Sequence, residues 1–411
     1  MKTVSIVNLG CKVNQYEADR IAAILVNSGF NVTFGLTPAD IYVLNTCAVT
    51  NEGERKSRNM VTKLLKLNAN ASVYVCGCAA QNNSQNFTKI ANVKMVIGTA
   101  NKDKIAYQIC ADNNVTCNYT TSQLSNRTRG VLKCQDGCNN FCSYCIIPYL
   151  RGREVSRPLT ELIAELDQMQ KQGIKEVVLT GINLSSYGKD LQGVEFVDLA
   201  KMFSDRPIRY RFSSLEVNVV TEPLLKYLST QPNFCDHFHL SMQSGCDHTL
   251  KKMNRHYTSQ DYLNRVSLIR KYFPNAGITT DVIVGFPTEE ESHFNETYNT
   301  CKKANFAEMH IFVYSKRAGT VAEKFKNVAT NVKERANKLA ELNEKNHTKF
   351  IKSNKGKTFS VIVENKKGEY FTGHTPNYIM CYFKGNYNSN DIVNIKIEKP
   401  YLDGALATVV K

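Results

Sequence analysis

Short apolar runs alternate with longer amphipathic stretches through the first 113 residues of the chain. The short runs are rich in Val, Ile and Tyr, a composition that predicts β-strands. The longer stretches place apolar residues at helical spacing, as Ile21, Ile24 and Leu25 do, and Gly29 is a helix stop. Such alternation predicts a parallel sheet with helices on both faces. The expected strands are 3–10, 40–47, 72–78 and 93–99, and the expected helices are 16–29 and 52–67.

The same alternation continues at a larger scale from about residue 120 to residue 315. Six strand candidates separated by helix candidates predict a closed or partly closed β/α barrel. No sequence repeat of 20–50 residues is found, so a solenoid is not supported. The strand candidates are 129–134, 175–181, 208–214, 236–241, 277–285 and 307–314. The helix candidates are 159–172, 197–203, 222–230, 259–272 and 289–304.

The period changes near the C-terminal end. A basic helix with sparse apolar positions is expected at 331–352, followed by short strands separated by Gly, Asn and Asp turns. Five strands without intervening helices predict a small all-β barrel of the OB type. Length and pattern together indicate an α/β chain of three domains, at 1–113, 120–350 and 351–411. The expected C-terminal strands are 357–364, 369–375, 378–383, 391–398 and 405–411.

The net charge of +15 is unevenly distributed. Residues 316–357 hold 12 Lys and Arg against 4 Asp and Glu, whereas the central part is nearly neutral. A basic patch of this kind is typical of nucleic-acid binding, and a solubilising helix face is the equally common alternative. No secretory signal and no apolar stretch of about 18 residues is present, so we expect a soluble cytoplasmic protein without a membrane segment.

Three cysteines in the central part carry the strongest chemical signal. Cys138, Cys142 and Cys145 are spaced so that one loop can wrap a [4Fe–4S] cluster, leaving one iron free to take a substrate. A structural zinc or a ferredoxin-like cluster would use four ligands, and Cys134 is the candidate for the fourth. Because Cys134 ends a predicted strand, we interpret it as a core thiol and favour the open cluster.

The N-terminal part holds a second set of three cysteines. Cys11, Cys47 and Cys78 each follow an expected strand, and the carboxyl ends of parallel strands meet at one sheet edge. Buried core thiols are the alternative, since cysteine is among the most buried residue types. Convergence of all three favours a second cluster, and Cys76 is left out because it lies within a strand.

The central spacing, with Tyr144 before the last cysteine, resembles the signature of the radical S-adenosylmethionine superfamily. The resemblance implies that S-adenosylmethionine binds the open iron and is cleaved to a 5′-deoxyadenosyl radical. Polar residues and Gly at the following strand ends fit its binding, with Glu216 accepting a ribose hydroxyl and Gly181 admitting the methionine part. The candidate cofactor-binding residues are Gly181, Asn183, Ser214, Glu216, Ser241 and Gln243.

The chain as a whole resembles the methylthiotransferases, a branch of that superfamily. The motifs GCKVN at 10–14, NTCAV at 45–49, GCAAQ at 77–81 and GCNNFC at 137–142, followed by Arg151-Gly152-Arg153, carry the resemblance. It implies that the cluster of Cys11, Cys47 and Cys78 supplies sulfur, and that the C-terminal part is a TRAM RNA-binding barrel. An external electron donor and a sulfur source are further implied partners, and a monomer is the simplest expectation.

The segment GCKVNQYEAD resembles the branch that acts on threonylcarbamoyl-adenosine in tRNA. Methylthiolation of isopentenyl-adenosine in tRNA, or of a ribosomal-protein aspartate, is the alternative within the family. A non-catalytic RNA-binding iron–sulfur redox sensor is the alternative of another class. Aromatic rings near lysines in the tail are candidates for stacking on RNA bases, although half of them must form the barrel core. These rings are Tyr370, Phe371, Tyr378, Tyr382 and Phe383.

Overall fold

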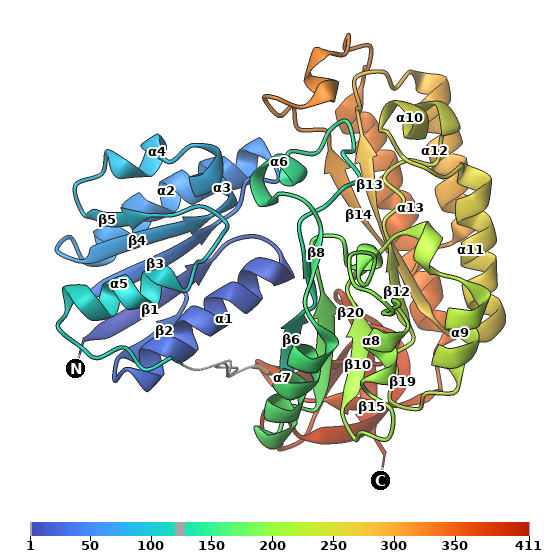
Figure 1. Cartoon of the computed structure of the whole chain (residues 1–411). Coiled ribbons are helices and arrows are strands. Elements are labelled where there is room, and N and C mark those ends of the chain that lie inside the picture. The colour runs from blue at the N-terminus through green and yellow to red at the C-terminus, as the bar shows by residue number, and fades with distance from the viewer. Residues whose placement is uncertain (1, 120–127, 411) are drawn as a thin grey trace.

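The computed structural model describes residues 2–119 and 128–410 and divides them among three groups of sheets (Figure 1). The expected start of the central domain, residue 120, lies outside the described residues. An N-terminal parallel sheet stands beside a central half-barrel, and a C-terminal sheet lies below the half-barrel in this view. The mixed α/β fold class and its parallel sheets are confirmed.

The N-terminal sheet is parallel and has the strand order β2-β1-β3-β4-β5. Helices α1 and α5 cover one face through Ile21, Ile24 and Ile105, and α2 covers the other through Val61 and Leu64. The strands are β1 Thr3–Asn8, β2 Asn31–Phe34, β3 Ile41–Thr46, β4 Ser72–Gly77 and β5 Val93–Val96. The helices are α1 Lys12–Asn27, α2 Asn51–Leu67, α3 Cys78–Asn82, α4 Gln85–Thr88 and α5 Lys104–Asp112.

Two details of this part differ from the sequence pattern. Strand β2 was not expected, because at the sheet edge its residues alternate between exposed and half-buried and form no apolar run. Helix α1 begins at Lys12, with Cys11 as its N-cap, four residues before the first expected position. Its first turn contains Asn14, a polar residue that is buried by contacts with distant parts of the chain.

The central part contains all six expected strands, and every pairing among them is parallel. They form two sheets, β10-β9-β6 and β11-β12-β13-β14, linked by a bridge between Tyr210 and Phe234. This arrangement is a partly closed β/α barrel with its helices outside (Figure 1). Its main strands are β6 Arg129–Lys133, β9 Glu176–Thr180, β10 Arg209–Phe212, β11 Ser214–Leu215, β12 His237–Leu240, β13 Gly277–Val284 and β14 Glu308–Val313.

The outer helices of the half-barrel bury one apolar face each against the strands. Leu162 and Leu166 do so from α7, and Tyr262 and Ile269 from α11. A short hairpin of β7 and β8 flanks the loop that carries the central cysteines. These elements are β7 Gln135–Asp136, α6 Ile147–Arg151, β8 Val155–Ser156, α7 Leu159–Lys171, α8 Asp198–Lys201, α9 Glu222–Ser229, α10 Asp247–Lys252, α11 Ser259–Tyr272 and α12 Glu291–Ala304.

Helix α13 Val332–Ser353 is the expected basic helix, and it packs on β14 and β19. The C-terminal sheet that follows has six strands rather than five, because the short β16 joins its edge. Every pairing in it is antiparallel except that of β18 with β20. The strands are β15 Thr358–Ile362, β16 Asn365–Lys367, β17 Tyr370–His374, β18 Met380–Phe383, β19 Ile392–Tyr401 and β20 Gly404–Val409.

The five aromatic candidates of the tail divide into two groups. Phe371, Tyr382 and Phe383 are buried, whereas Tyr370 and Tyr378 are partly exposed. Tyr378 does not face outward: its ring stacks between His237 of β12, with ring centroids 4.2 Å apart, and His374, at 4.7 Å. The C-terminal sheet is therefore fastened to the barrel by an aromatic stack. No helix among the described residues has the length and apolar character needed to cross a membrane.

A buried ion pair fastens α13 to the rest of the barrel. Arg335 Nη1 lies 2.7 Å from Glu289 Oε1 and 3.0 Å from the Glu289 carbonyl oxygen. The exposed fractions of Arg335 and Glu289 are 1% and 0%. A charge buried to this degree is tolerated only while its partner remains.

We expect Arg335→Met to lower the free energy of unfolding by about 3–5 kcal/mol, because it strands the Glu289 carboxylate inside the protein. Lys338→Met is the matched control: it lies three residues further along α13, and its ion pairs with Glu334 and Glu291 are half exposed. That change should cost less than about 1 kcal/mol. Urea unfolding followed by circular dichroism measures both, and equal losses in the two variants would contradict the prediction.

Candidate active site

All six predicted cluster cysteines line a single cavity of about 400 Å³. It lies where the carboxyl ends of the N-terminal strands face the carboxyl ends of the barrel strands, with α6 between the two parts (Figure 1). Carboxyl ends of parallel strands are where α/β folds bind ligands. The cysteines are Cys11, Cys47 and Cys78 on one side, and Cys138, Cys142 and Cys145 on the other.

The N-terminal three are positioned by three adjacent strands. Cys11 follows β1 and caps α1, Cys47 follows β3, and Cys78 opens α3 directly after β4. The turn into α3 requires glycine, because Gly77 has φ +104° and a Cβ there would lie 2.5 Å from the Thr46 carbonyl oxygen. Cys76 lies within β4 and is fully buried, and it does not line the cavity.

The central three lie on a loop that is fastened at both ends. The backbone N–H of Cys138 donates to the Gly152 carbonyl at 3.1 Å, and that of Ser143 donates to the Met253 carbonyl at 3.0 Å. Cys134 lies outside the cavity, fully buried, with its Sγ donating to the Leu132 carbonyl at 3.5 Å. Burial raises the pKa of Cys134 to about 12, as expected of a core thiol.

The chemistry of the donor set fits two iron–sulfur clusters of three ligands each. Burial and then the neighbouring Cys142 raise the pKa of Cys145 to about 12, and burial is also the main cause of the raised pKa of Cys47 and Cys78. Neighbouring cysteines also raise one another's pKa, because thiolates repel, and a shared cationic centre would offset that repulsion. Soft thiolates are ligands for iron–sulfur clusters, and three of them leave one iron open.

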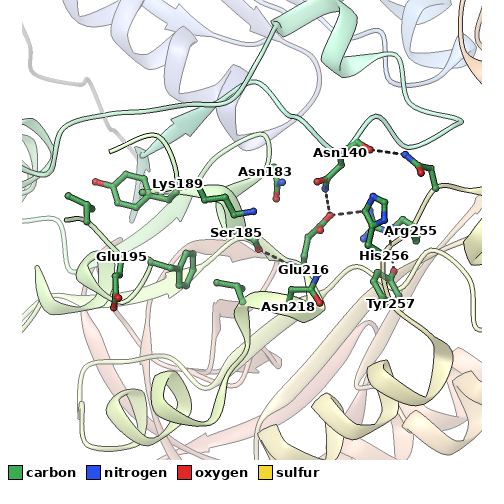
Figure 2. A pocket seen from close by; sticks show the side chains of 16 residues that line it. Asn140, Asn183, Ser185, Lys189, Glu195, Glu216, Asn218, Arg255, His256 and Tyr257 are labelled. Atoms are coloured by element: carbon green, nitrogen blue, oxygen red, sulfur yellow. Dashed lines mark hydrogen bonds and ion pairs between the residues drawn. The ribbon is translucent and has the colours of Figure 1, made fainter. Parts of the chain in front are cut away.

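All six residues predicted to bind S-adenosylmethionine line the same cavity. Gly181 is also needed for packing, since a Cβ there would lie 2.7 Å from Gln135 Oε1. Glu216 is the best anchored: its Oε1 accepts from Asn140 Nδ2 at 2.8 Å and lies 3.0 Å from Arg255 Nη1 (Figure 2). Their role in binding stays a prediction. The six are Gly181, Asn183, Ser214, Glu216, Ser241 and Gln243.

A second cavity of about 480 Å³ continues from the first (Figure 2). Both are lined by Asn140, Asn183, Glu216 and Arg255, so Glu216 stands at the junction between them. Its carboxylate can accept hydroxyl donors on a ligand that extends from the cysteines into the second cavity.

Arg255 is the functional candidate that the sequence pattern missed. Its Nη1 lies 3.3 Å from Cys142 Sγ as well as beside Glu216, and its side chain is 6% exposed. A guanidinium at a cluster thiolate neutralises part of its charge. Arg255 lies after α10, a short helix that was not expected, and the motif spacing contained no signal for it.

A buried charge network beside the cysteine cavity joins the N-terminal and central parts. Arg151, whose side chain is 0% exposed, places Nη1 3.0 Å from both Glu17 and Asp136, and its Nη2 2.6 Å from Asn14 Oδ1. Glu17 also pairs with Lys102 and, at 3.1 Å, with Lys133. Arg151 and Asp136 belong to the central part and Glu17 to the N-terminal part, so the network sets their relative position.

Burial alone would raise the pKa of Glu17, but Lys102, Arg151 and Lys133 outweigh it and hold that pKa well below its ordinary value. The carboxylate is therefore charged throughout the neutral range. A carboxyl group with a lowered pKa stabilises the fold above its ordinary pKa and loses that contribution as the pH falls.

Two family models match the chain. The one described as the Radical SAM superfamily matches residues 132–301, and the one described as Uncharacterized protein family UPF0004 matches residues 3–98. Among solved structures, the radical S-adenosylmethionine methyltransferase TsrM from Kitasatospora setae, with cobalamin and a [4Fe-4S] cluster bound, is 16% identical. The TM-score is 0.52, and the match covers 76% of this chain and 75% of that one. Fold and site together define a radical S-adenosylmethionine enzyme.

Relatives of nearly full length identify the family. The chain is 35% identical to the threonylcarbamoyladenosine tRNA methylthiotransferase MtaB of Bacillus subtilis, covering 100% of this chain and 98% of the relative. It is 34% identical to the tRNA-2-methylthio-N(6)-dimethylallyladenosine synthase of Clostridium tetani, covering 95% and 92%. The chain belongs to the tRNA methylthiotransferase family of radical S-adenosylmethionine enzymes. This confirms the expected family and an enzymatic function.

We expect Glu17→Gln to lower the free energy of unfolding by about 3 kcal/mol at pH 7, because three buried cations lose their shared anion. The difference from the unchanged protein should shrink as the pH falls below about 4.3, where the glutamate of the unfolded chain becomes protonated. Urea unfolding at a series of pH values measures it. Glu52→Gln, on the exposed face of α2, is the control and should leave the unfolding midpoint unchanged. A difference that stays constant down to pH 3 would contradict the assignment.

Proposed function

We propose that this chain inserts a methylthio group at C2 of N6-threonylcarbamoyladenosine beside the anticodon, at position 37 of tRNA. The observation that carries the proposal is the single cavity in which two sets of three cysteines face each other. The family acts on tRNA, and relatives named for threonylcarbamoyladenosine align with 100% of the chain in Bacillus subtilis and 88% in Aquifex aeolicus. The motif GCKVNQYEAD supports the same branch.

Within this proposal each set of cysteines holds one [4Fe–4S] cluster. Cys138, Cys142 and Cys145 hold the cluster whose open iron takes S-adenosylmethionine, and Cys11, Cys47 and Cys78 hold the second. When bound, these groups supply a carbon radical that can remove hydrogen from an unactivated C–H bond, together with sulfur for insertion. Because both sets of cysteines line one cavity, the radical and the sulfur would both be within reach of one nucleoside.

The side chains around the cysteines orient the cofactor and exclude water. Glu216, fixed by Asn140 and Arg255, accepts a ribose hydroxyl, while the strand-end groups of Ser241 and Gln243 face the same space. Arg255 donates to Cys142 and so links the cluster loop to the ribose-binding carboxylate. Gly181, Asn183 and Ser214 complete the wall.

The basic helix α13 and the C-terminal sheet suit an RNA partner. We assign residues 1–113 to the sulfur-supplying part, 120–350 to radical chemistry and 351–411 to a TRAM-type RNA contact. Among the tail aromatics, the partly exposed Tyr370 is the better stacking candidate, with Lys384 Nζ 5.4 Å from its ring centroid. Binding through Lys and Arg weakens steeply with salt.

The alternatives are the other substrates of the family. Isopentenyl (dimethylallyl) adenosine is the rival within tRNA, since some relatives are named for it, and a ribosomal-protein aspartate is the other. The redox-sensor alternative lacks support, because the family is one of enzymes. The proposal further includes an external electron donor, a sulfur source, a cytoplasmic location and a monomer.

Iron content tests the two-cluster assignment. We expect anaerobically reconstituted protein to bind about eight irons, and the triple variant Cys11→Ala, Cys47→Ala, Cys78→Ala to bind about four. The matched triple variant at Cys138, Cys142 and Cys145 should also bind about four. About four irons in the unchanged protein would remove the N-terminal cluster.

Nucleoside analysis tests the substrate. Transfer RNA from cells lacking this protein should contain threonylcarbamoyladenosine without its 2-methylthio derivative, and expression of the protein should restore that derivative. Expression of Cys138→Ala should not, because the radical cluster loses a ligand. Liquid chromatography with mass spectrometry reads both nucleosides. Added mass on isopentenyl-adenosine alone, or on ribosomal protein alone, would assign the enzyme to another branch.

A further inference from the structure

A third cavity of about 390 Å³ adjoins the cysteine cavity, and Cys11 is the one cysteine among its lining residues. The two share Cys11, Lys12, Ser213 and Ser214, so they meet beside the N-terminal set of cysteines. From there the third cavity follows the barrel strands to Tyr378 of the C-terminal part. We call it the side chamber.

Three cations and one carboxylate, that of Asp281, line the side chamber, and one of the cations is unpaired. Arg211 pairs at 2.8 Å with Glu176, which it shares with Arg209, and Arg129 pairs with Glu364 at 3.3 Å. Lys12 lines both the side chamber and the cysteine cavity, and no carboxylate of the described residues forms an ion pair with its Nζ. Lys12 is exposed, and an unpaired ammonium group in the wall of a cavity can pair with an anionic ligand.

The electrostatics of a neighbouring histidine agree with this. His237 is buried against Tyr378, and its pKa is lowered well below the ordinary value, first by burial and then by Arg211, His239 and Lys12. The ring is therefore neutral and adds no competing charge. The cationic groups of the chamber are therefore those of Lys12, Arg129 and Arg211.

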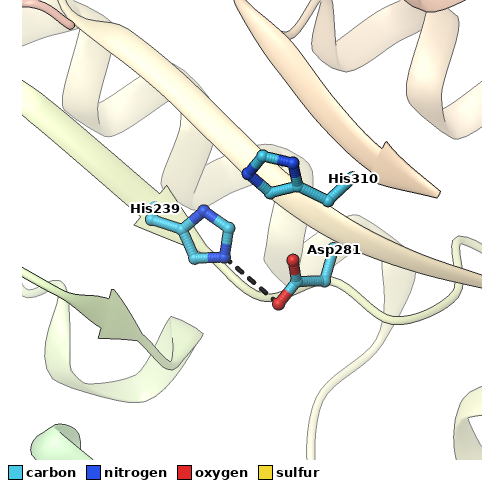
Figure 3. Close-up of side chains that lie close together, drawn as sticks. All are labelled: His239, Asp281 and His310. Atoms are coloured by element: carbon cyan, nitrogen blue, oxygen red, sulfur yellow. Dashed lines mark ion pairs between the residues drawn. The ribbon is translucent and has the colours of Figure 1, made fainter. Parts of the chain in front are cut away.

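Three polar side chains of the chamber converge from adjacent strands (Figure 3). His239 Nε2 lies 3.2 Å from Asp281 Oδ2, and His239 Nδ1 lies 2.9 Å from the Thr279 hydroxyl. One donor or acceptor atom each of His239, Asp281 and His310 lies within 4.8 Å of the others. The contact with His239 holds the Asp281 carboxylate in place. These three side chains can therefore exchange hydrogen bonds with a small polar group of a ligand.

We propose that the side chamber receives the N6 substituent of the nucleoside, with the Lys12 ammonium pairing with the carboxylate of its threonyl group and Asp281 accepting from its hydroxyl. This inference rests on the proposed function. On the purine ring a single nitrogen separates C2 from the carbon that carries N6. A base with C2 in the cysteine cavity therefore directs its substituent into an adjoining space, and Lys12 stands at that boundary.

The same geometry explains how rivals are rejected. An isopentenyl group is uncharged and apolar, so it offers no partner to the Lys12 ammonium and no hydrogen bond to Asp281. A site whose polar groups pair with one part of a ligand discriminates against a ligand that lacks that part. Lys12 is in this sense a residue that determines specificity.

The test compares Lys12→Gln and Lys12→Arg with the unchanged protein, all reconstituted anaerobically. Three anticodon stem-loop RNAs carry threonylcarbamoyladenosine, its threonyl methyl ester, or adenosine at the target position. Fluorescence anisotropy gives each Kd. We expect Lys12→Gln to raise the Kd of the carboxylate RNA about tenfold and to leave the other two unchanged, while Lys12→Arg keeps the preference. Lys104→Gln, on α5 and outside the chamber, is the matched control and should match the unchanged protein.

Each other outcome overturns a distinct statement. An equal loss with all three RNAs would mean that Lys12 contacts a backbone phosphate, and a fall in iron content would mean that it retains the cluster. Either result rejects the proposal that Lys12 binds the carboxylate of the N6 substituent. An unchanged Kd for the carboxylate RNA would reject it as well. If the unchanged protein neither prefers nor methylthiolates the threonylcarbamoyl RNA, the proposed function itself fails.

Discussion

The arrangement of this enzyme depends on one buried guanidinium. Arg151 is fully enclosed and binds Glu17 and Asn14 of the N-terminal part and Asp136 of the central part. Burying several charges costs free energy, and such a network contributes less to stability than to a unique geometry. Here the geometry is the spacing between two sets of cysteines that come from different sheets. An apolar contact, which is not directional, would hold the two parts together without fixing their relative position.

With the two parts held in this position, the direction of their strands determines which residues line the site. The N-terminal sheet and the two barrel sheets are parallel and direct their carboxyl ends to the same space, so residues that follow strands of all three share one set of walls. Parallel sheets place functional residues at this edge because the loops there are free to vary. Arg255 then links the parts within the site, since it contacts both Cys142 and Glu216. The loop of the central cysteines and the strand end that carries Glu216 are thus linked through one side chain.

The sequence predicted those features that follow from local pattern. Alternating strands and helices placed the cysteines and the strand-end residues correctly at one edge, because strand polarity determines where each strand's last residue lies. It did not predict β2, whose edge position removes the apolar run, or the first turn of α1, whose buried Asn14 is held by Arg151 from 137 positions away. Arg255 and the unpaired Lys12 were invisible for the same reason, since long-range contacts leave no periodic trace. The inward and outward tail aromatics could not be told apart, because Tyr378 is covered by another part of the chain.

The stack of Tyr378 between His237 and His374 bears on how such enzymes can be recombined. A C-terminal sheet whose only role was to bind RNA could be exchanged between relatives without changing the site. This tail instead contributes an aromatic side chain to the wall of a chamber beside the reaction centre. Exchanging the C-terminal sheet therefore also exchanges part of the wall of that chamber. The C-terminal sheet is a separate segment of the sequence, but it is not structurally independent of the cavities in the barrel.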